Sequence, residues 1–112
     1  MKTYPMGEFE EIVLLTVGVL YDEAYGGAIK DAIEEKAQRN VSVGALQAAL
    51  KRMEKKGYLE SREGEFNAQR GGKPKRYYTI TAFGKQALQK NKDIRLKLWR
   101  AIPKIAFDFK YT

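Results

Sequence analysis

The residues of this 112-residue chain best suited to chemistry gather in a glycine-rich stretch, RGGKPKRYYTIT, from Arg70 to Thr81. Its four cations have no acidic residue between them. A loop that only reverses the chain needs no such charge, whereas a loop that touches a phosphate backbone does. The expected DNA contacts of this loop are Arg70, Gly71, Gly72, Lys73, Lys75 and Arg76. The alternative is a solvated hairpin whose charges only prevent edge pairing between strands.

A second candidate segment, VSVGALQAALKRMEKKG, runs from Val41 to Gly57. Its apolar residues recur at helical spacing and predict one buried stripe, made of Leu46, Ala49, Leu50 and Met53. The opposite face begins with small and amide side chains and continues with cations. The major groove is about 12 Å wide, so short or hydrogen-bonding residues suit the bases and cations suit the flanking phosphates. The expected contacts are Ser42, Gly44, Ala45, Gln47, Ala48, Lys51, Arg52 and Lys55.

The remaining elements must position these two segments. Periodicity predicts a largely buried first helix within residues 7–22, with Leu15 widening its apolar stripe, and a second helix within residues 22–38. Ser42 and Gly57 are the expected caps of the third helix. Residues 58–66 and 75–81 favour two hairpin strands with the basic loop between them. Thr81 is the expected N-cap of a final helix, which kinks or restarts at Pro103.

The order helix, helix, helix, hairpin, helix predicts a fold that is mainly α with a β-hairpin wing, in the α+β class. We expect a winged helix-turn-helix over residues 1–81 and a C-terminal dimerisation helix over residues 82–112. In that last helix a 4-3-4 spacing of apolar residues lacks a partner within the chain and favours a homodimer. The expected interface residues are Phe9, Leu98, Trp99, Ile102, Ile105 and Phe109. Trp99 has a second interpretation, as a stacking surface for a small aromatic effector.

Composition limits the other functions. The net charge is +7, and the chain has neither cysteine nor histidine. Without these residues there is no thiolate nucleophile, no imidazole base and no ordinary zinc site, so we expect no catalytic residues, metal or cofactor. Residues 1–23 are acidic, whereas the chain after residue 40 is basic, which suits a polyanionic partner. No leader or membrane-spanning run is evident, so a cytoplasmic protein without a membrane partner is expected.

Four patches, in order, resemble the PadR family of transcriptional regulators: GEFEEIVLL, YGGAI, VSVGALQAALKRMEKKGYL and GGKPKRYYTITAFG. The chain departs from the family pattern at Gln47, where the family usually has Tyr, at Ala48, where it has Pro, and at Gly27, where it has a second Tyr. The resemblance implies a homodimer with the last helix packed across the two-fold axis. It also implies that small aromatic molecules are sensed near that interface.

These observations together predict a sequence-specific, double-stranded DNA-binding transcriptional regulator that acts as a homodimer. We expect repression, because a small dimer on an operator blocks polymerase without further machinery. The alternative is a winged-helix module that binds another protein through its acidic amino-terminal face, without specific DNA binding. A carboxylate-based enzyme is disfavoured by the absence of any motif with catalytic or metal-ligand spacing.

Overall fold

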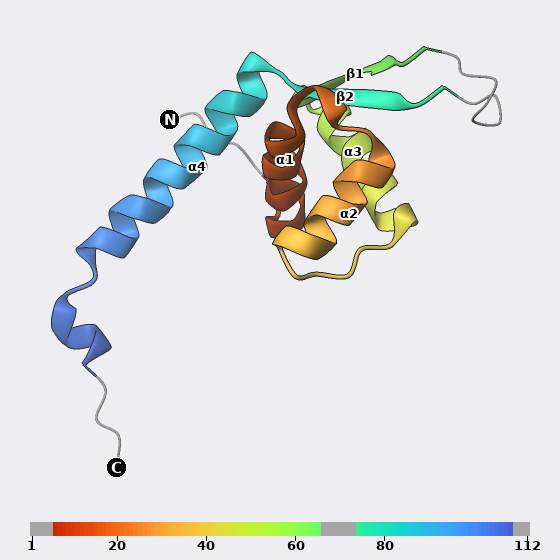
Figure 1. Ribbon diagram of the computed structural model, residues 1–112. Coiled ribbons are helices and arrows are strands. Elements are labelled where there is room, and N and C mark those ends of the chain that lie inside the picture. The colour runs from red at the N-terminus through yellow and green to blue at the C-terminus, as the bar shows by residue number, and fades with distance from the viewer. Residues whose placement is uncertain (1–5, 66–73, 109–112) are drawn as a thin grey trace.

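The computed structural model describes residues 6–65 and 74–108 (Figure 1). Three helices, α1 (Glu8–Leu20), α2 (Gly26–Lys36) and α3 (Val43–Lys55), come first, with a single 3₁₀ turn at Tyr21–Glu23. An antiparallel pair follows, β1 (Leu59–Glu63) and β2 (Arg76–Ile80), and then α4 (Ala82–Ala101) and a 3₁₀ turn at Lys104–Phe107. The predicted order of elements and the α+β winged-helix class are confirmed.

The core lies where the first three helices meet the base of the hairpin. The stripe predicted for the third helix is buried as expected, and its four residues are each at most 1% exposed. Side chains from α1, α2 and both strands complete the cluster, and they include Val13, Leu14, Val17, Ile29, Ile33, Leu59 and Tyr78. Most of the apolar burial is therefore finished before α4 begins.

Both ends of α3 are capped by the predicted residues. Ser42 Oγ accepts a hydrogen bond from the Ala45 N–H at 3.1 Å. Gly57 has φ = 86°, a conformation that glycine adopts without steric cost. The Tyr58 N–H then bonds the Met53 carbonyl at 2.9 Å, which is the capping pattern of a helix that ends in a left-handed glycine. The length and direction of α3 are thus set by local chemistry.

The hairpin register places Leu59 opposite Ile80 and Ser61 opposite Tyr78. Tyr78 points into the core and Thr79 away from it, as the alternation predicts. The segment before α2 extends this small sheet, because Tyr25 bridges Tyr77 and the Tyr78 N–H bonds the Ala24 carbonyl at 2.8 Å. The base of the wing is therefore attached directly to the start of α2.

Thr81 and Gly84 connect the wing to α4. Thr81 Oγ1 accepts the Gly84 N–H at 3.0 Å and donates to the Gly57 carbonyl, so one side chain links the end of α3 to the start of α4. A Cβ on Gly84 would lie 2.2 Å from the Tyr58 carbonyl oxygen, a distance that no side chain tolerates. Only glycine lets α4 approach the backbone this closely.

Beyond that contact α4 runs away from the helical body, on the side opposite the strands in Figure 1. Among its described residues only Gly84 and Ala87 are buried. The helix ends at Ala101 because Pro103 follows and Ile102 is extended, with ψ = 121°. The expected interruption at Pro103 is confirmed, because α4 ends at Ala101 and a 3₁₀ turn begins at Lys104. Ile102 and Ile105 of the 4-3-4 spacing therefore lie beyond α4, and Phe109 lies outside the described residues. The dimer interface stays a prediction. Within residues 6–65 and 74–108, no helix is long and apolar enough to cross a bilayer.

Candidate nucleic-acid interface

The outer face of α3 is open along its whole length. Four residues of α3 are buried in the core and the other nine are exposed. Seven of the exposed residues were predicted as DNA contacts: Gly44, Ala45, Gln47, Ala48, Lys51, Arg52 and Lys55. Glu54, an exposed acid on the same helix, accepts a hydrogen bond from Ser61 Oγ at 2.6 Å. Ser42, also predicted, is exposed but is engaged in capping the helix. Val43 is 61% exposed and was not predicted as a contact. Its position in the first turn, rather than its residue type, is the signal that could have found it, because first-turn residues of such a helix lie nearest the bases.

Gln47 is positioned by the start of α2. A Cβ added to Gly26 would lie 3.1 Å from Gln47 Nε2, so the amide rests against the bare backbone of α2's first turn. A side chain at residue 26 would displace it by a few tenths of an ångström. Gln47 therefore reaches the exposed face from a defined direction, with an amide that can pair with an adenine edge.

The cations of α3 fall into two groups. Lys51 and Lys55 have no ion-pair partner within the described part of the chain. Arg52 Nε lies 3.4 Å from Glu10 Oε2, and Lys56 Nζ lies 3.5 Å from the same oxygen. Lys56 was not predicted, and no local pattern marks it, because its partner is 46 residues earlier in the chain.

Glu10 itself is only 7% exposed although it is an acidic residue. Burial alone would raise its pKa, but the Gly7 N–H, Lys56 and Arg52 together hold the pKa below the ordinary value of 4.5. The Gly7 N–H donates to Glu10 Oε1 at 3.1 Å, which also caps the first turn of α1. Glu10 is therefore an ionised carboxylate at neutral pH, facing Arg52 in the last turn of α3 and Lys56 just after it.

The described cations at the base of the wing are held by neighbours. Lys75 Nζ lies 3.8 Å from the centre of the Tyr25 ring, a cation–π contact. Arg76 donates to Ser61 Oγ at 3.0 Å and pairs with Glu63 at 3.4 Å. Lys75, Tyr25, Gly26 and Gln47 thus form a chain of contacts from the wing to α3. Four predicted wing residues, Arg70, Gly71, Gly72 and Lys73, lie outside the described residues.

The side chains predicted for a dimer interface differ in their surroundings. Leu98, Trp99 and Ile105 are 65%, 64% and 78% exposed. Phe9 instead packs against the core, with the Arg39 guanidinium 5.1 Å from its ring centre. Trp99 is not isolated, because its ring centre lies 5.5 Å from that of Phe107 across the break at Pro103. Sequence spacing did not identify Phe107, since the chain turns between the two rings.

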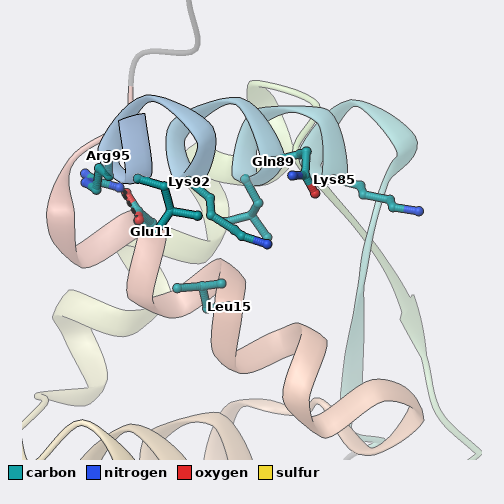
Figure 2. Close-up of a pocket in the computed structure, with 8 residues that line it drawn as sticks. Glu11, Leu15, Lys85, Gln89, Lys92 and Arg95 are labelled. Carbon is teal, nitrogen blue, oxygen red and sulfur yellow. Dashed lines mark hydrogen bonds and ion pairs between the residues drawn. The ribbon is translucent and has the colours of Figure 1, made fainter. Parts of the chain in front are cut away.

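A groove of about 510 Å³ lies between α1 and α4 (Figure 2). Its apolar surface comes from Leu15, Leu88 and Leu96, while Glu11 and Arg95 form an ion pair at one end. The expectation that Leu15 joins the buried stripe of the first helix is wrong: Leu15 is 49% exposed, because α4 leaves the body before covering it. Trp99 is not among the residues that line the groove.

The profile of the Transcriptional regulator PadR-like family matches residues 14–90, from α1 to the first half of α4. The chain belongs to the PadR-like family. A PadR family transcription regulator from Clostridium difficile R20291 is 31% identical, with 80% of this chain and 91% of that chain covered and a TM-score of 0.61. A PadR-like transcription factor from Bacteroides fragilis is 27% identical over 82% of this chain and 84% of that chain, with a TM-score of 0.69. A comparison with curated proteins finds no match.

A third relative shows the fold alone. The PadR-like transcriptional regulator BC4206 from Bacillus cereus is 20% identical, covers 90% of this chain and 93% of its own, and has a TM-score of 0.70. The match of the family includes α3 and both strands of the wing, the parts that carry the candidate interface. This PadR-like chain is therefore a DNA-binding regulator of transcription, in a family that is in general not enzymatic.

Proposed function

We propose that this PadR-like chain reads a specific operator with α3 and represses transcription as a homodimer. The observation that carries the proposal is the placement of the Gln47 amide on the exposed face of α3, against the bare backbone of Gly26. A glutamine in that position can bond an adenine edge in the major groove. The small residues Gly44, Ala45 and Ala48 around it leave the helix free to approach the bases.

The phosphate contacts of the proposal come from two places. Lys51 and Lys55 extend from the exposed face of α3 without an ion partner among the described residues. Lys75 and Arg76 stand at the base of the wing, where Lys75 contacts Tyr25 next to Gly26, and Arg76 is held by Ser61 and Glu63. Phosphate contacts of this kind position a protein on DNA and make its affinity depend on salt.

The homodimer is supported by apolar side chains that stay about half exposed or more within the described chain. Leu98 and Trp99 are exposed on α4, and Leu15 and Val19 are exposed on α1. A monomer that left both patches in water would be prone to aggregate. A second copy, packed on α4 and α1 about a two-fold axis, would cover them and place two α3 helices one DNA turn apart, about 34–36 Å.

Repression and an effector are the further parts of the proposal. A small dimer on its operator blocks polymerase without additional contacts. The groove between α1 and α4 has an apolar surface and a volume of about 510 Å³, which suits a small aromatic molecule. Trp99 does not line this groove, so in this proposal a stacking role for Trp99 needs a second copy that brings its ring to the groove.

The alternative, a protein-binding module that uses an acidic face, has less support. The three acids in the first turn of α1 are all engaged within the chain: Glu8 with Arg39 at 2.6 Å, Glu10 with Arg52 and Lys56, and Glu11 with Arg95. Three of the five acids of residues 1–23 are thus neutralised within the chain, and only Asp22 and Glu23 remain exposed without an ion pair among the described residues. This leaves little charge for a basic partner.

Selection of bound fragments from random double-stranded DNA, followed by titration of the selected and a scrambled duplex at several salt concentrations, tests the proposal. We expect a two-fold symmetric sequence to be enriched, and the selected duplex to bind at least 10³-fold more tightly than the scrambled one. Equal affinity for the two duplexes would contradict sequence-specific recognition of an operator. Binding that does not depend on salt would contradict the proposed phosphate contacts.

A further inference from the structure

Among the described residues, Glu10 is the one acidic residue that is buried. Its side chain lies almost completely buried in the first turn of α1. Among the described residues, no buried side-chain nitrogen or oxygen lacks a hydrogen-bond partner. One oxygen accepts the Gly7 N–H at 3.1 Å, and both oxygens lie 3.5 Å from Lys56 Nζ. Arg52 Nε lies 3.4 Å from Oε2. One negative charge therefore faces two positive ones.

Both cations come from the C-terminal end of α3 and not from α1. Arg52 lies in the last turn of α3 and Lys56 directly follows the end of that helix, and their side chains are 54% and 40% exposed. Each is long and open enough to turn toward a phosphate, as the exposed Lys51 and Lys55 can. To do so, however, the cation must leave a buried carboxylate with fewer partners, which is unfavourable because an uncompensated buried charge is poorly solvated.

We propose that Glu10 is an internal counter-anion of the recognition helix, which withholds Arg52 and Lys56 from DNA phosphates. The proposal rests on the DNA-binding function proposed above and assigns a residue outside the interface a role in specificity. Non-specific affinity comes almost entirely from phosphate neutralisation. By reducing the number of cations that α3 offers, Glu10 lowers binding to arbitrary DNA and leaves the base contacts of Gln47 unchanged. The ratio of specific to non-specific affinity rises accordingly.

The test is the salt dependence of binding to a non-specific duplex. Glu10→Gln removes the charge but retains a side-chain oxygen that can accept the Gly7 N–H. We expect its slope of log affinity against log salt to steepen by about 0.9 to 1.8, one or two additional phosphate contacts. Each contact corresponds to a roughly 3.5-fold larger loss of affinity over a four-fold rise in salt. Glu11→Gln is the matched control, because it adds the same net charge but frees Arg95 on α4 rather than a cation on α3.

Arg52→Gln, made alone and in the Glu10→Gln background, distinguishes an electrostatic role of Glu10 from a role in folding. Arg52→Gln should leave the slope nearly unchanged when Glu10 is present, and should reduce it by about 0.9 in the Glu10→Gln background. An equal slope for the wild type and Glu10→Gln, or a full reduction by Arg52→Gln alone, would overturn the proposal. If Glu10→Gln does not fold, as followed by circular dichroism, the single variant Arg52→Gln still decides. A wild-type slope near zero would instead reject the DNA-binding function itself.

Discussion

Glu11 on α1 and Arg95 on α4 form an ion pair across 84 residues of sequence, and both carboxylate oxygens accept from one guanidinium nitrogen. The pair raises the pKa of Arg95 through the hydrogen bond to Glu11 and its charge. It closes one end of the groove in Figure 2 and lies where α4 has already left the core. The neighbouring Glu10 faces α3 instead, so the first turn of α1 contacts both the arm and the recognition helix.

Arg95→Gln should loosen α4 while leaving the helical body intact. Because the Arg95 side chain is 59% exposed, the free energy of unfolding should fall by less than about 1 kcal/mol. Hydrogen exchange in the second half of α4 should accelerate, whereas exchange in α3 should not change. Lys97→Gln is the control, since Lys97 is exposed on α4 and forms no ion pair with the described residues. Equal acceleration in both variants would mean that the pair does not hold the arm.

Gly84→Ala should be strongly destabilising, by about 3 kcal/mol, because its Cβ would lie 2.2 Å from a backbone carbonyl that cannot move aside. Gly44→Ala makes the same chemical change where nothing lies within 4 Å, and should stabilise α3 by up to about 1 kcal/mol. Urea denaturation of both variants measures the difference. A Gly84→Ala variant as stable as the wild type would contradict the close approach of α4 to Tyr58.

The pH dependence of the free energy of unfolding should reflect the ionisation of Glu10. Its folded-state pKa is lowered by the Gly7 N–H, Lys56 and Arg52 against the opposing effect of burial, so its contribution is fully present above pH 4.5. That contribution is lost as the pH falls through the lower folded value. The free energy of unfolding of Glu10→Gln should therefore decline less than that of the wild type between pH 5 and pH 3. Parallel declines would show that the cluster does not stabilise the fold.

Gln47→Ala should relax base preference at one position of each half-site, which corresponds to about 1–3 kcal/mol of discrimination. Binding to a scrambled duplex should stay nearly the same. Gly26→Ala should produce part of the same effect, because its Cβ meets the Gln47 amide at 3.1 Å, and it should add nothing once Gln47 is replaced. Affinities for a panel of singly substituted operators measure both. A parallel loss of specific and non-specific binding would make Gln47 a structural residue.

Truncation after Asn91 should yield a folded monomer with weaker operator binding. The last core residue is Ala87, so the hydrophobic cluster survives, whereas the exposed Leu98 and Trp99 are removed. Sedimentation equilibrium and thermal denaturation measure assembly and folding separately. A truncated protein that still forms dimers would place the interface on Leu15 and Val19 of α1, and replacing both by Gln should then disrupt it.

The sequence determined the elements and their ends, because these depend on neighbours within a few residues. Ser42, Gly57 and Thr81 act as caps through hydrogen bonds that span at most a turn or two, and period-two alternation predicted that Tyr78 and Thr79 point to opposite sides of β2. The exposed face of α3 followed from the same logic, since burying one helical stripe exposes the opposite one. Val43 was missed because residue type, rather than its first-turn position, guided the choice.

Tertiary structure alone decided which of these residues are free to act. Arg52 and Lys51 are adjacent cations in sequence, yet only Arg52 faces a buried carboxylate that lies 42 residues away. Leu14 and Leu15 are equally apolar, yet Leu14 is 0% exposed in the core and Leu15 is 49% exposed on the surface of α1. Phe107 meets Trp99 because the chain turns at Pro103. Ion pairing and burial depend on partners that the fold brings together from distant parts of the chain. A local pattern of charge or hydrophobicity does not predict which distant residues come into contact.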